Sequence, residues 1–305
     1  MKPERRYTDP LPLGSDEEPY SKGLMARALI RAGVTAERAV EVARRVEQDL
    51  SARGKHIIDL ERLQELAVDV LGEAEGTRSV GHLRRYHELT ELEMPLIILI
   101  GGATGTGKST VATEVAYRLG ITRVTSTDFV RQTMRALFTP EFLPAIHMSS
   151  FDAGKALPTA QEKEIDPLLH GFLEQTRHVL VGVQAAIERS LEEGWSMVLE
   201  GVHLVPGMLP RQIEGALVVE CVIGIESEET HAGHFWIRDM SSDGIRPLDK
   251  YLDRIADIRY LQDFIVERAQ VEGVPVIENS DREKAIGSVM ELVLTAADSA
   301  RKVPA

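Results

Sequence analysis

The sequence predicts an α/β protein in which a doubly wound parallel five-stranded sheet is preceded by a small all-helical domain. Three observations lead to this prediction. The apolar run Leu96–Ile100 enters a glycine-rich turn and then a helical pattern. Beyond it, short apolar runs alternate with helical patterns, which is typical of a parallel sheet. Before Pro95 the apolar residues recur at helical spacing.

The part of the chain before the sheet is expected to contain an arm and a helical domain. Residues 1–18 are rich in Pro, Asp and Glu without periodicity, so we expect a flexible N-terminal arm there. Residues 19–93 carry the helical patterns and are expected to form the small helical domain. Its helices are expected around Leu24–Leu29, behind Thr35 and behind Asp59, with a break over 72–77 and a connecting helix over 82–92.

Residues 94–305 are expected to form the sheet domain. A long helix over Pro167–Glu193 repeats apolar residues every three or four positions, and we expect this stripe to be core because a strand follows directly. The strands are expected at Leu96–Gly101, Arg123–Ser126, Ser196–Glu200, Leu217–Ile225 and Pro275–Glu278.

Composition limits the class of partner. The net charge of −13 lacks the basic footprint of a nucleic-acid-binding protein, so we expect a small-molecule substrate instead. The N-terminus has no apolar signal core, and no stretch approaches the roughly 18 apolar residues of a membrane span. We therefore expect a cytoplasmic protein without membrane contact. The single cysteine, Cys221, lies in an apolar run and is expected to be a buried, inert thiol.

The turn after the first strand has the spacing of a P-loop. Gly102 and Gly107 bracket four residues and precede a lysine and a serine. In this motif, backbone N–H groups surround nucleotide phosphates, the lysine acts on the β/γ oxygens, and the serine hydroxyl binds Mg²⁺. The sheet domain is therefore predicted to be a P-loop NTPase fold that binds ATP and Mg²⁺. The residues assigned to ATP here are Gly102, Ala103, Thr104, Gly105, Thr106, Gly107, Lys108, Ser109 and Thr110, with Lys108 also catalytic and Ser109 a metal ligand.

The end of the second strand is predicted to supply the acceptor side of the site. Ligands of doubly wound sheets lie outside the carboxyl ends of the strands, so Asp128 is expected to face the P-loop. We interpret Asp128 as a catalytic base for an acceptor hydroxyl, with Arg131 and then Arg135 holding an anionic substrate. The alternative for Asp128 is a helix N-cap, and for Arg131 an ordinary surface residue.

The third strand delivers a second acid to the same edge. Glu200 leaves the end of a buried run, which is where a Walker-B-type carboxylate binds Mg²⁺ or its water shell. The alternative is a carboxylate that pairs with a neighbouring side chain. His203, three residues further on, is assigned to substrate binding together with Glu200, although a loop histidine often has only structural partners.

A cation-bearing segment after the fourth strand is predicted to be a lid. Arg238 and Arg246 are expected to bring positive charge onto the nucleotide, with Arg238 also catalytic. Arg254 and Arg259 follow on a helix and are alternatively its solvated face. A metal site formed by His231 and His234 is a weak alternative, because no third ligand is evident in the sequence.

Together these motifs resemble the 2-phosphoglycerate kinase family. The resemblance rests on Gly101–Ser109, Ser126–Asp128, Gly171–Phe172, Glu200–Gly207 and Tyr260–Gln262, and it extends to Pro19–Leu24 and Ala32–Gly33, which resemble the ATP-cone-like segment of that family. It implies ATP-dependent phosphorylation of the 3-hydroxyl of 2-phosphoglycerate, a phosphorylated three-carbon acid, to give 2,3-bisphosphoglycerate and ADP. One departure is His234, where the resemblance leads us to expect a lid arginine before Phe235.

Two other functions fit parts of the sequence. A kinase for another hydroxyl compound, such as a phosphorylated polyol or a sugar acid, uses the same phosphate-binding loop. A regulatory nucleotide switch is less consistent with the chain, because a switch needs no acceptor site of the Asp128-x-x-Arg131 type.

Overall fold

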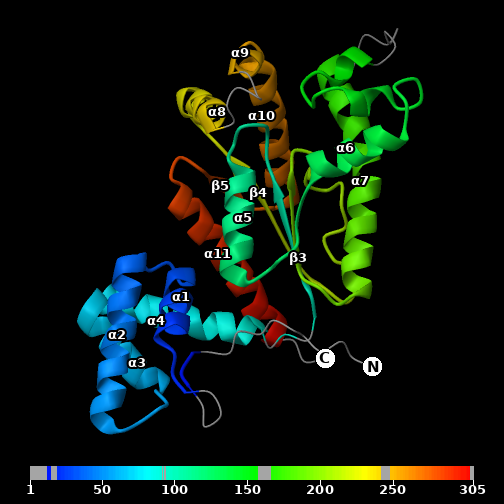
Figure 1. The fold of residues 1–305 in the computed structure, drawn as a ribbon. Coiled ribbons are helices and arrows are strands. Elements are labelled where there is room, and N and C mark those ends of the chain that lie inside the picture. Colours follow the sequence, from blue (N-terminus) through cyan, green and yellow to red (C-terminus); the bar gives the residue numbers. More distant parts are fainter. Residues whose placement is uncertain are drawn as a thin grey trace. The chain divides into compact units, whose positions relative to one another are not determined.

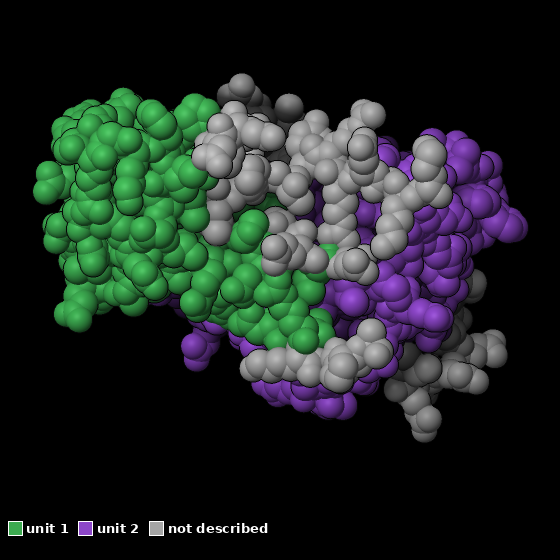
Figure 2. All heavy atoms as spheres, turned by 90° about the horizontal axis from the view of Figure 1, so that it is seen from below, with its two compact units in different colours: residues 1–93, 117–120, 297–305 green, residues 94–116, 121–296 purple. Residues whose placement is uncertain are grey.

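The computed structural model describes residues 12–14, 19–90, 92, 94–156, 166–241 and 248–302 of the chain. These residues form two compact units, which Figure 2 shows in different colours. The first comprises residues Met1–Glu93, Tyr117–Gly120 and Ala297–Ala305, and the second Met94–Ala116 and Ile121–Ala296. Of the expected arm, only residues 12–14 are described. None of the described helices is long and apolar enough to cross a membrane.

The first unit has a core formed by its helices. Asp59 accepts a hydrogen bond from the backbone N–H of Arg62 at 2.7 Å and so caps the third helix as expected, whereas Thr35 makes no side-chain cap bond. The central apolar side chains, such as Met25, Val42 and Leu63, are fully buried. The helices of this unit are α1 (Lys22–Arg31), α2 (Ala36–Arg53), α3 (Leu60–Leu71) and α4 (Glu73–Thr90).

The break that the sequence analysis predicts over 72–77 is wrong, because α4 begins at Glu73 and runs through it. Gly72 does end α3, with φ of +85°. Gly76 lies inside α4, and a Cβ there would approach the backbone of Val68 to 2.7 Å. This glycine therefore permits close packing of α4 on α3 instead of marking a turn.

The second unit contains the parallel sheet shown in Figure 1. Its strand order is β2-β3-β1-β4-β5, and every neighbouring pair is parallel. The predicted α/β class with five parallel strands is confirmed. Each strand begins and ends within one residue of its expected position: β1 (Leu96–Gly101), β2 (Val124–Ser126), β3 (Met197–Gly201), β4 (Leu217–Gly224) and β5 (Val276–Glu278).

Helices cover both faces of this sheet. α7 (Pro167–Glu192) packs Val179, Val183 and Ile187 onto strands β1 and β3, so its apolar stripe is core, as the sequence analysis expects. α10 (Ile255–Glu272) packs on the same face, and α5 (Lys108–Leu119) and α11 (Arg282–Lys302) lie on the other (Figure 1). The remaining elements are α6 (Thr127–Leu137), η1 (Pro144–His147), η2 (Ala153–Ala156), α8 (Glu228–Ser241) and α9 (Leu248–Leu252).

Candidate active site

The glycine-rich turn between β1 and α5 has the backbone of an anion-binding loop. Gly102, Gly105 and Gly107 have φ of +142°, +89° and +83°, values that residues other than glycine rarely adopt. A Cβ at Gly102 would approach the carbonyl oxygen of Ile223 to 2.4 Å. α5 begins at Lys108, so the positive end of its dipole lies at this turn.

Side chains bind the outward carbonyl groups of four consecutive residues in this loop. Lys108 Nζ donates to the carbonyl of Ala103 at 3.1 Å, and Asn279 Nδ2 donates to that of Thr106 at 2.8 Å. Between them, His231 Nε2 lies 2.8 Å from the carbonyl oxygen of Thr104, and His234 Nδ1 lies 3.1 Å from that of Gly105. With the carbonyl groups held in this way, the loop is stabilised in one backbone conformation.

These contacts bear on the metal alternative for the two histidines. A carbonyl oxygen only accepts hydrogen bonds, so His231 Nε2 and His234 Nδ1 carry protons here. Neither nitrogen is then available to a metal ion. Burial lowers the pKa of His231, which keeps its ring neutral at pH 7.

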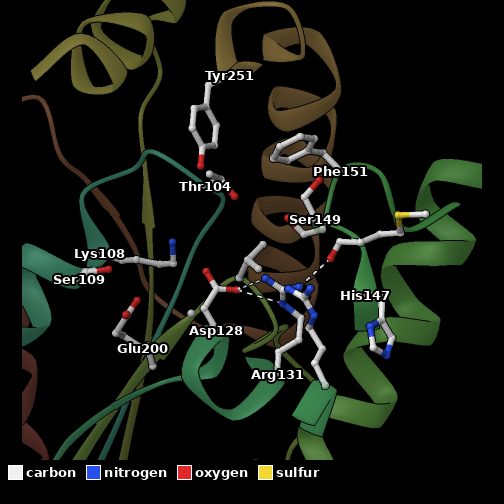
Figure 3. A pocket seen from close by; sticks show the side chains of 16 residues that line it. Thr104, Lys108, Ser109, Asp128, Arg131, His147, Ser149, Phe151, Glu200 and Tyr251 are labelled. Carbon is white, nitrogen blue, oxygen red and sulfur yellow. Dashed lines mark hydrogen bonds and ion pairs between the residues drawn. The ribbon is translucent and has the colours of Figure 1, made fainter. Parts of the chain in front are cut away.

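A cavity of about 430 Å³ opens beside the P-loop (Figure 3). It brings together predicted residues from three strand ends: Lys108 and Ser109 after β1, Asp128 and Arg131 after β2, and Glu200 at the end of β3. Of the residues predicted to bind ATP, the cavity lining does not include Gly102, Ala103, Gly105, Thr106, Gly107 or Thr110. The other lining residues are Thr104, Ser126, Arg135, His147, Met148, Ser149, Ser150, Phe151, Gly201, Val202 and Tyr251.

Asp128 lies in the first turn of α6 and does not cap it. The cap is Ser126, whose hydroxyl accepts from the N–H of Phe129 at 3.0 Å. The carboxylate of Asp128 is 70% exposed, which leaves it accessible from the cavity. Partial desolvation raises its pKa, but the nearby positive charge, first of all that of Arg131, and the hydrogen bond from Arg131 together outweigh this effect, so the pKa of Asp128 is below its ordinary value.

The two predicted substrate arginines differ in what already binds them. Arg131 donates from Nη1 to the carbonyl groups of Ile146 (3.0 Å) and Met148 (2.7 Å), and from Nε and Nη2 to Asp128 (3.3 Å each). Arg135 donates from Nη1 to Gln132, and its buried Nε has no partner among the described residues. Because Arg135 lines the cavity and has fewer described partners, it is the more available guanidinium for an anion, whereas Arg131 holds the carboxylate and the neighbouring loop.

Glu200 occupies the end of β3, between β1 and β2 in the sheet. Its strand neighbours are Ile100 and Ser126, and the residue is 6% exposed. Among the described residues, none forms an ion pair or hydrogen bond with its carboxylate. In Figure 3, Glu200 lies on the same side of the cavity as Lys108 and Ser109. The alternative of a carboxylate paired with a neighbouring side chain is thus not what the structure shows.

His203 does not line the cavity. Its side chain is fully buried, and both ring nitrogens have partners: Nδ1 lies 2.8 Å from Thr127 Oγ1 and Nε2 lies 2.9 Å from Gln175 Oε1. The expected contact of His203 with substrate is therefore not supported.

The predicted lid lies partly outside the described residues. The side chain of Arg238 and the whole of Arg246 are outside the described part of the chain. Arg254 and Arg259 are not simply a solvated helix face. Arg254 pairs with Asp152 (3.1 Å) and Asp257 (2.9 Å), and Arg259 donates to the carbonyl groups of Ile225 and Glu226.

The sequence analysis missed one wall of the cavity and the residues that secure the loop. His147, Ser149, Ser150 and Phe151 come from a segment with no periodicity and no motif, so no pattern marks them. Asn279 follows β5 immediately. Because the carboxyl ends of parallel strands meet at one edge of the sheet, this position is a sequence signal that places Asn279 near the P-loop. Buried polar residues on an apolar helical stripe, such as Gln175, are a second usable signal.

Comparisons with known proteins identify the family of the chain. The chain is 37% identical over 273 residues to the 2-phosphoglycerate kinase of Thermococcus kodakarensis, which covers 89% of this chain and 91% of that protein. It is 38% identical over 275 residues to that of Methanothermobacter thermautotrophicus, covering 90% of each. No family model matches the chain. Among solved structures, a shikimate kinase from Acinetobacter baumannii in complex with shikimate shows low similarity, with TM-score 0.39, 16% identity, and coverage of 71% of this chain and 99% of that one. The chain is a P-loop kinase and belongs to the 2-phosphoglycerate kinase family.

Proposed function

We propose that this protein transfers the γ-phosphoryl group of ATP to the 3-hydroxyl of 2-phosphoglycerate, giving 2,3-bisphosphoglycerate and ADP. The observation that carries the proposal is the shared cavity. In it, Lys108 of the P-loop, the exposed carboxylate of Asp128 and the available guanidinium of Arg135 line one space of about 430 Å³. The names of the relatives supply the acceptor.

The donor side consists of the P-loop and its surroundings. Lys108 uses one of its three N–H groups on the carbonyl of Ala103, and the other two remain for phosphate oxygens. The loop backbone, held by its glycine conformations, suits an anion. Oxygen donors are the ligands that Mg²⁺ prefers, and the hydroxyl of Ser109 and the carboxylate of Glu200 are of this type. When bound, Mg²⁺ neutralises charge on the phosphates.

The acceptor side consists of α6 and the segment after it. Asp128 accepts a hydrogen bond from the acceptor hydroxyl and orients it toward the γ-phosphorus. A carboxylate with a lowered pKa is a weak base before reaction, and it takes the proton only as the new bond forms. Arg135 pairs with the phosphate or the carboxylate of the acceptor, since it lines the cavity and its hydrogen bond among the described residues goes to Gln132 alone.

In the proposed step, the new O–P bond joins the acceptor oxygen to the γ-phosphorus. The bond from that phosphorus to the bridging oxygen of ADP breaks, and the hydroxyl proton passes to Asp128 and then to solvent. Phosphoryl transfer needs positioning and charge stabilisation more than covalent catalysis. We propose that Arg238 and Arg246 add positive charge from the lid.

A panel of acceptors tests this proposal. With Mg-ATP, we expect 2-phosphoglycerate to have the highest kcat/KM among glycerate, 2-phosphoglycerate, 3-phosphoglycerate and inositol phosphates, measured by ADP release. An acceptor without its phosphate leaves a guanidinium group unpaired, so glycerate should be at least about 100-fold poorer. Equal or better turnover of another acceptor would assign the protein to that compound, and ATP binding without acceptor-stimulated ADP release would indicate a nucleotide switch.

A further inference from the structure

A buried hydrogen-bond network lies directly behind the acceptor side of the cavity. It is centred on His203, which follows β3 in the turn that begins at Gly201 and is fully buried. The ring of Phe172 stacks near it, with the ring centroids 6.4 Å apart. Since His203 has no access to the cavity, any effect it has on the reaction acts through its two partners, Thr127 and Gln175.

The hydrogen bonds of Gln175 determine which nitrogen of His203 carries the proton. Gln175 Nε2 donates to the carbonyl groups of Ala145 (2.6 Å) and Met148 (3.1 Å). Its other amide atom, Oε1, is therefore the one that faces His203 Nε2, and an amide oxygen only accepts. It follows that Nε2 of His203 carries a proton.

The other ring nitrogen is then an acceptor. Complete burial lowers the pKa of His203 to about 3, so the ring is neutral at pH 7 and has one proton only. That proton is on Nε2, which leaves Nδ1 to accept from the hydroxyl of Thr127 at 2.8 Å. The charged groups around the ring are Asp128, Arg131 and Lys108, all on the cavity side.

Both ends of the network reach the residues that hold the acceptor. Thr127 is the first residue of α6 and the neighbour of Asp128, and it is fully buried against Gly201, where a Cβ would approach its Oγ1 to 1.8 Å. At the other end, the carbonyl of Met148 accepts from both Gln175 Nε2 (3.1 Å) and Arg131 Nη1 (2.7 Å). Asp128 and Arg131 are themselves joined, as the dashed lines in Figure 3 show.

We propose that His203, as a neutral ring with its proton on Nε2, is a positioning residue of the acceptor side. Through Thr127 it sets the start of α6 and hence the carboxylate of Asp128. Through Gln175 it sets the carbonyl groups that hold Arg131. Among the described residues, its hydrogen bonds go to Thr127 and Gln175 and not to the P-loop. This inference rests on the proposed function for the identity of the acceptor but not for the arrangement of the network.

The kinetic test removes one hydroxyl and keeps the volume. Thr127→Val deletes the donor to His203, and Thr176→Val is the matched control, because Thr176 is also fully buried, neighbours Gln175 and has a hydroxyl without a partner among the described residues. We expect Thr127→Val to lower kcat/KM for 2-phosphoglycerate by about 10- to 100-fold, as small misplacements of reacting groups do. The KM for ATP should stay within about twofold, Thr127→Ser should restore most of the loss, and Thr176→Val should match the wild type.

Three kinetic results would contradict the proposal. The first is wild-type acceptor kinetics in Thr127→Val. The second is a KM for ATP that rises in this variant as much as the KM for the acceptor. The third is an equal loss of kcat/KM in Thr176→Val. A wild-type enzyme that does not phosphorylate 2-phosphoglycerate would overturn the proposed function instead, and the same comparison then applies to the best acceptor of the panel.

A spectroscopic test needs no substrate. In ¹⁵N-histidine NMR of the full chain, the resonance absent from His203→Gln is that of His203. We expect protonated Nε2, unprotonated Nδ1 and no titration between pH 5 and pH 8. A proton on Nδ1, or titration near pH 6.5, would refute the network as described, whatever the acceptor.

Discussion

At the scale of single residues, the site combines groups whose roles follow from what already binds them. Arg131 and Arg135 are one helical turn apart, yet Arg131 uses most of its donors on Asp128 and two carbonyl groups, whereas Arg135 keeps a buried N–H without a described partner. Sequence reasoning placed both at the acceptor side but had no means of separating them. The carbonyl groups that occupy Arg131 come from a loop 15 or more residues away.

Asp128 provides a test at this scale. Asp128→Asn keeps the shape of the side chain but removes the proton acceptor, so we expect kcat to fall by about 10² to 10⁴ with the KM for ATP nearly unchanged. Steady-state kinetics with circular dichroism as a control for folding measure this. A folded variant with near-normal kcat would show that Asp128 has no part in the reaction.

The lowered pKa of His203 predicts how the stability of the protein changes with pH. Its pKa is about 3 in the folded protein and about 6.5 when unfolded, so between these values the unfolded chain binds more protons. Its contribution to stability is complete above about pH 6.5 and is lost as the pH falls. In urea unfolding, the advantage of wild type over His203→Gln should therefore shrink below pH 6.5, by up to about 1.4 kcal/mol per pH unit. An advantage that is constant from pH 7.5 to pH 5 would contradict this.

At the scale of elements, strands and motifs were predictable where local pattern decides the outcome. The five strands are short apolar runs bounded by turns, and the P-loop has fixed spacing. The start of α4 was not predictable, because Gly76 is explained by the backbone of Val68 on α3, a contact that no local pattern reveals. The segment 147–151 was missed for the same reason: its place at the cavity follows from packing against α7.

The contact of α8 with the P-loop is testable. His231→Phe keeps an aromatic ring against Phe235, whose centroid lies 5.3 Å from that of His231, but removes the donor to the carbonyl of Thr104. Loss of one hydrogen bond that leaves a carbonyl unpaired is worth about 1–3 kcal/mol, so we expect the KM for ATP to rise about 5-fold or more while the KM for the acceptor changes little. Isothermal titration with ATP provides the direct measurement. Unchanged ATP affinity would mean that the P-loop holds its conformation without His231.

At the scale of the whole molecule, all five strands and every residue lining the cavity lie beyond Pro95. The helical core of the first unit supplies none of them. We therefore expect a chain that lacks residues 1–90 to fold and to bind ATP. It loses the ion pairs of Arg85 with Asp298 and of Glu88 with Arg301, and partly exposed pairs of this kind contribute about 0–1 kcal/mol each. An insoluble truncation, or one without an ATP-binding signal by calorimetry, would show that the kinase domain depends on the helical one.

The measurement that tests the central claim most directly is ³¹P NMR of the product formed from 2-phosphoglycerate and Mg-ATP by the full chain. The account predicts two phosphomonoester resonances for 2,3-bisphosphoglycerate, which grow with those of ADP, and none with Lys108→Ala, which lacks the P-loop ammonium group. ADP and inorganic phosphate without a new monoester, or a product formed equally well by Lys108→Ala, would contradict the assignment of this cavity as the site of phosphoryl transfer to 2-phosphoglycerate.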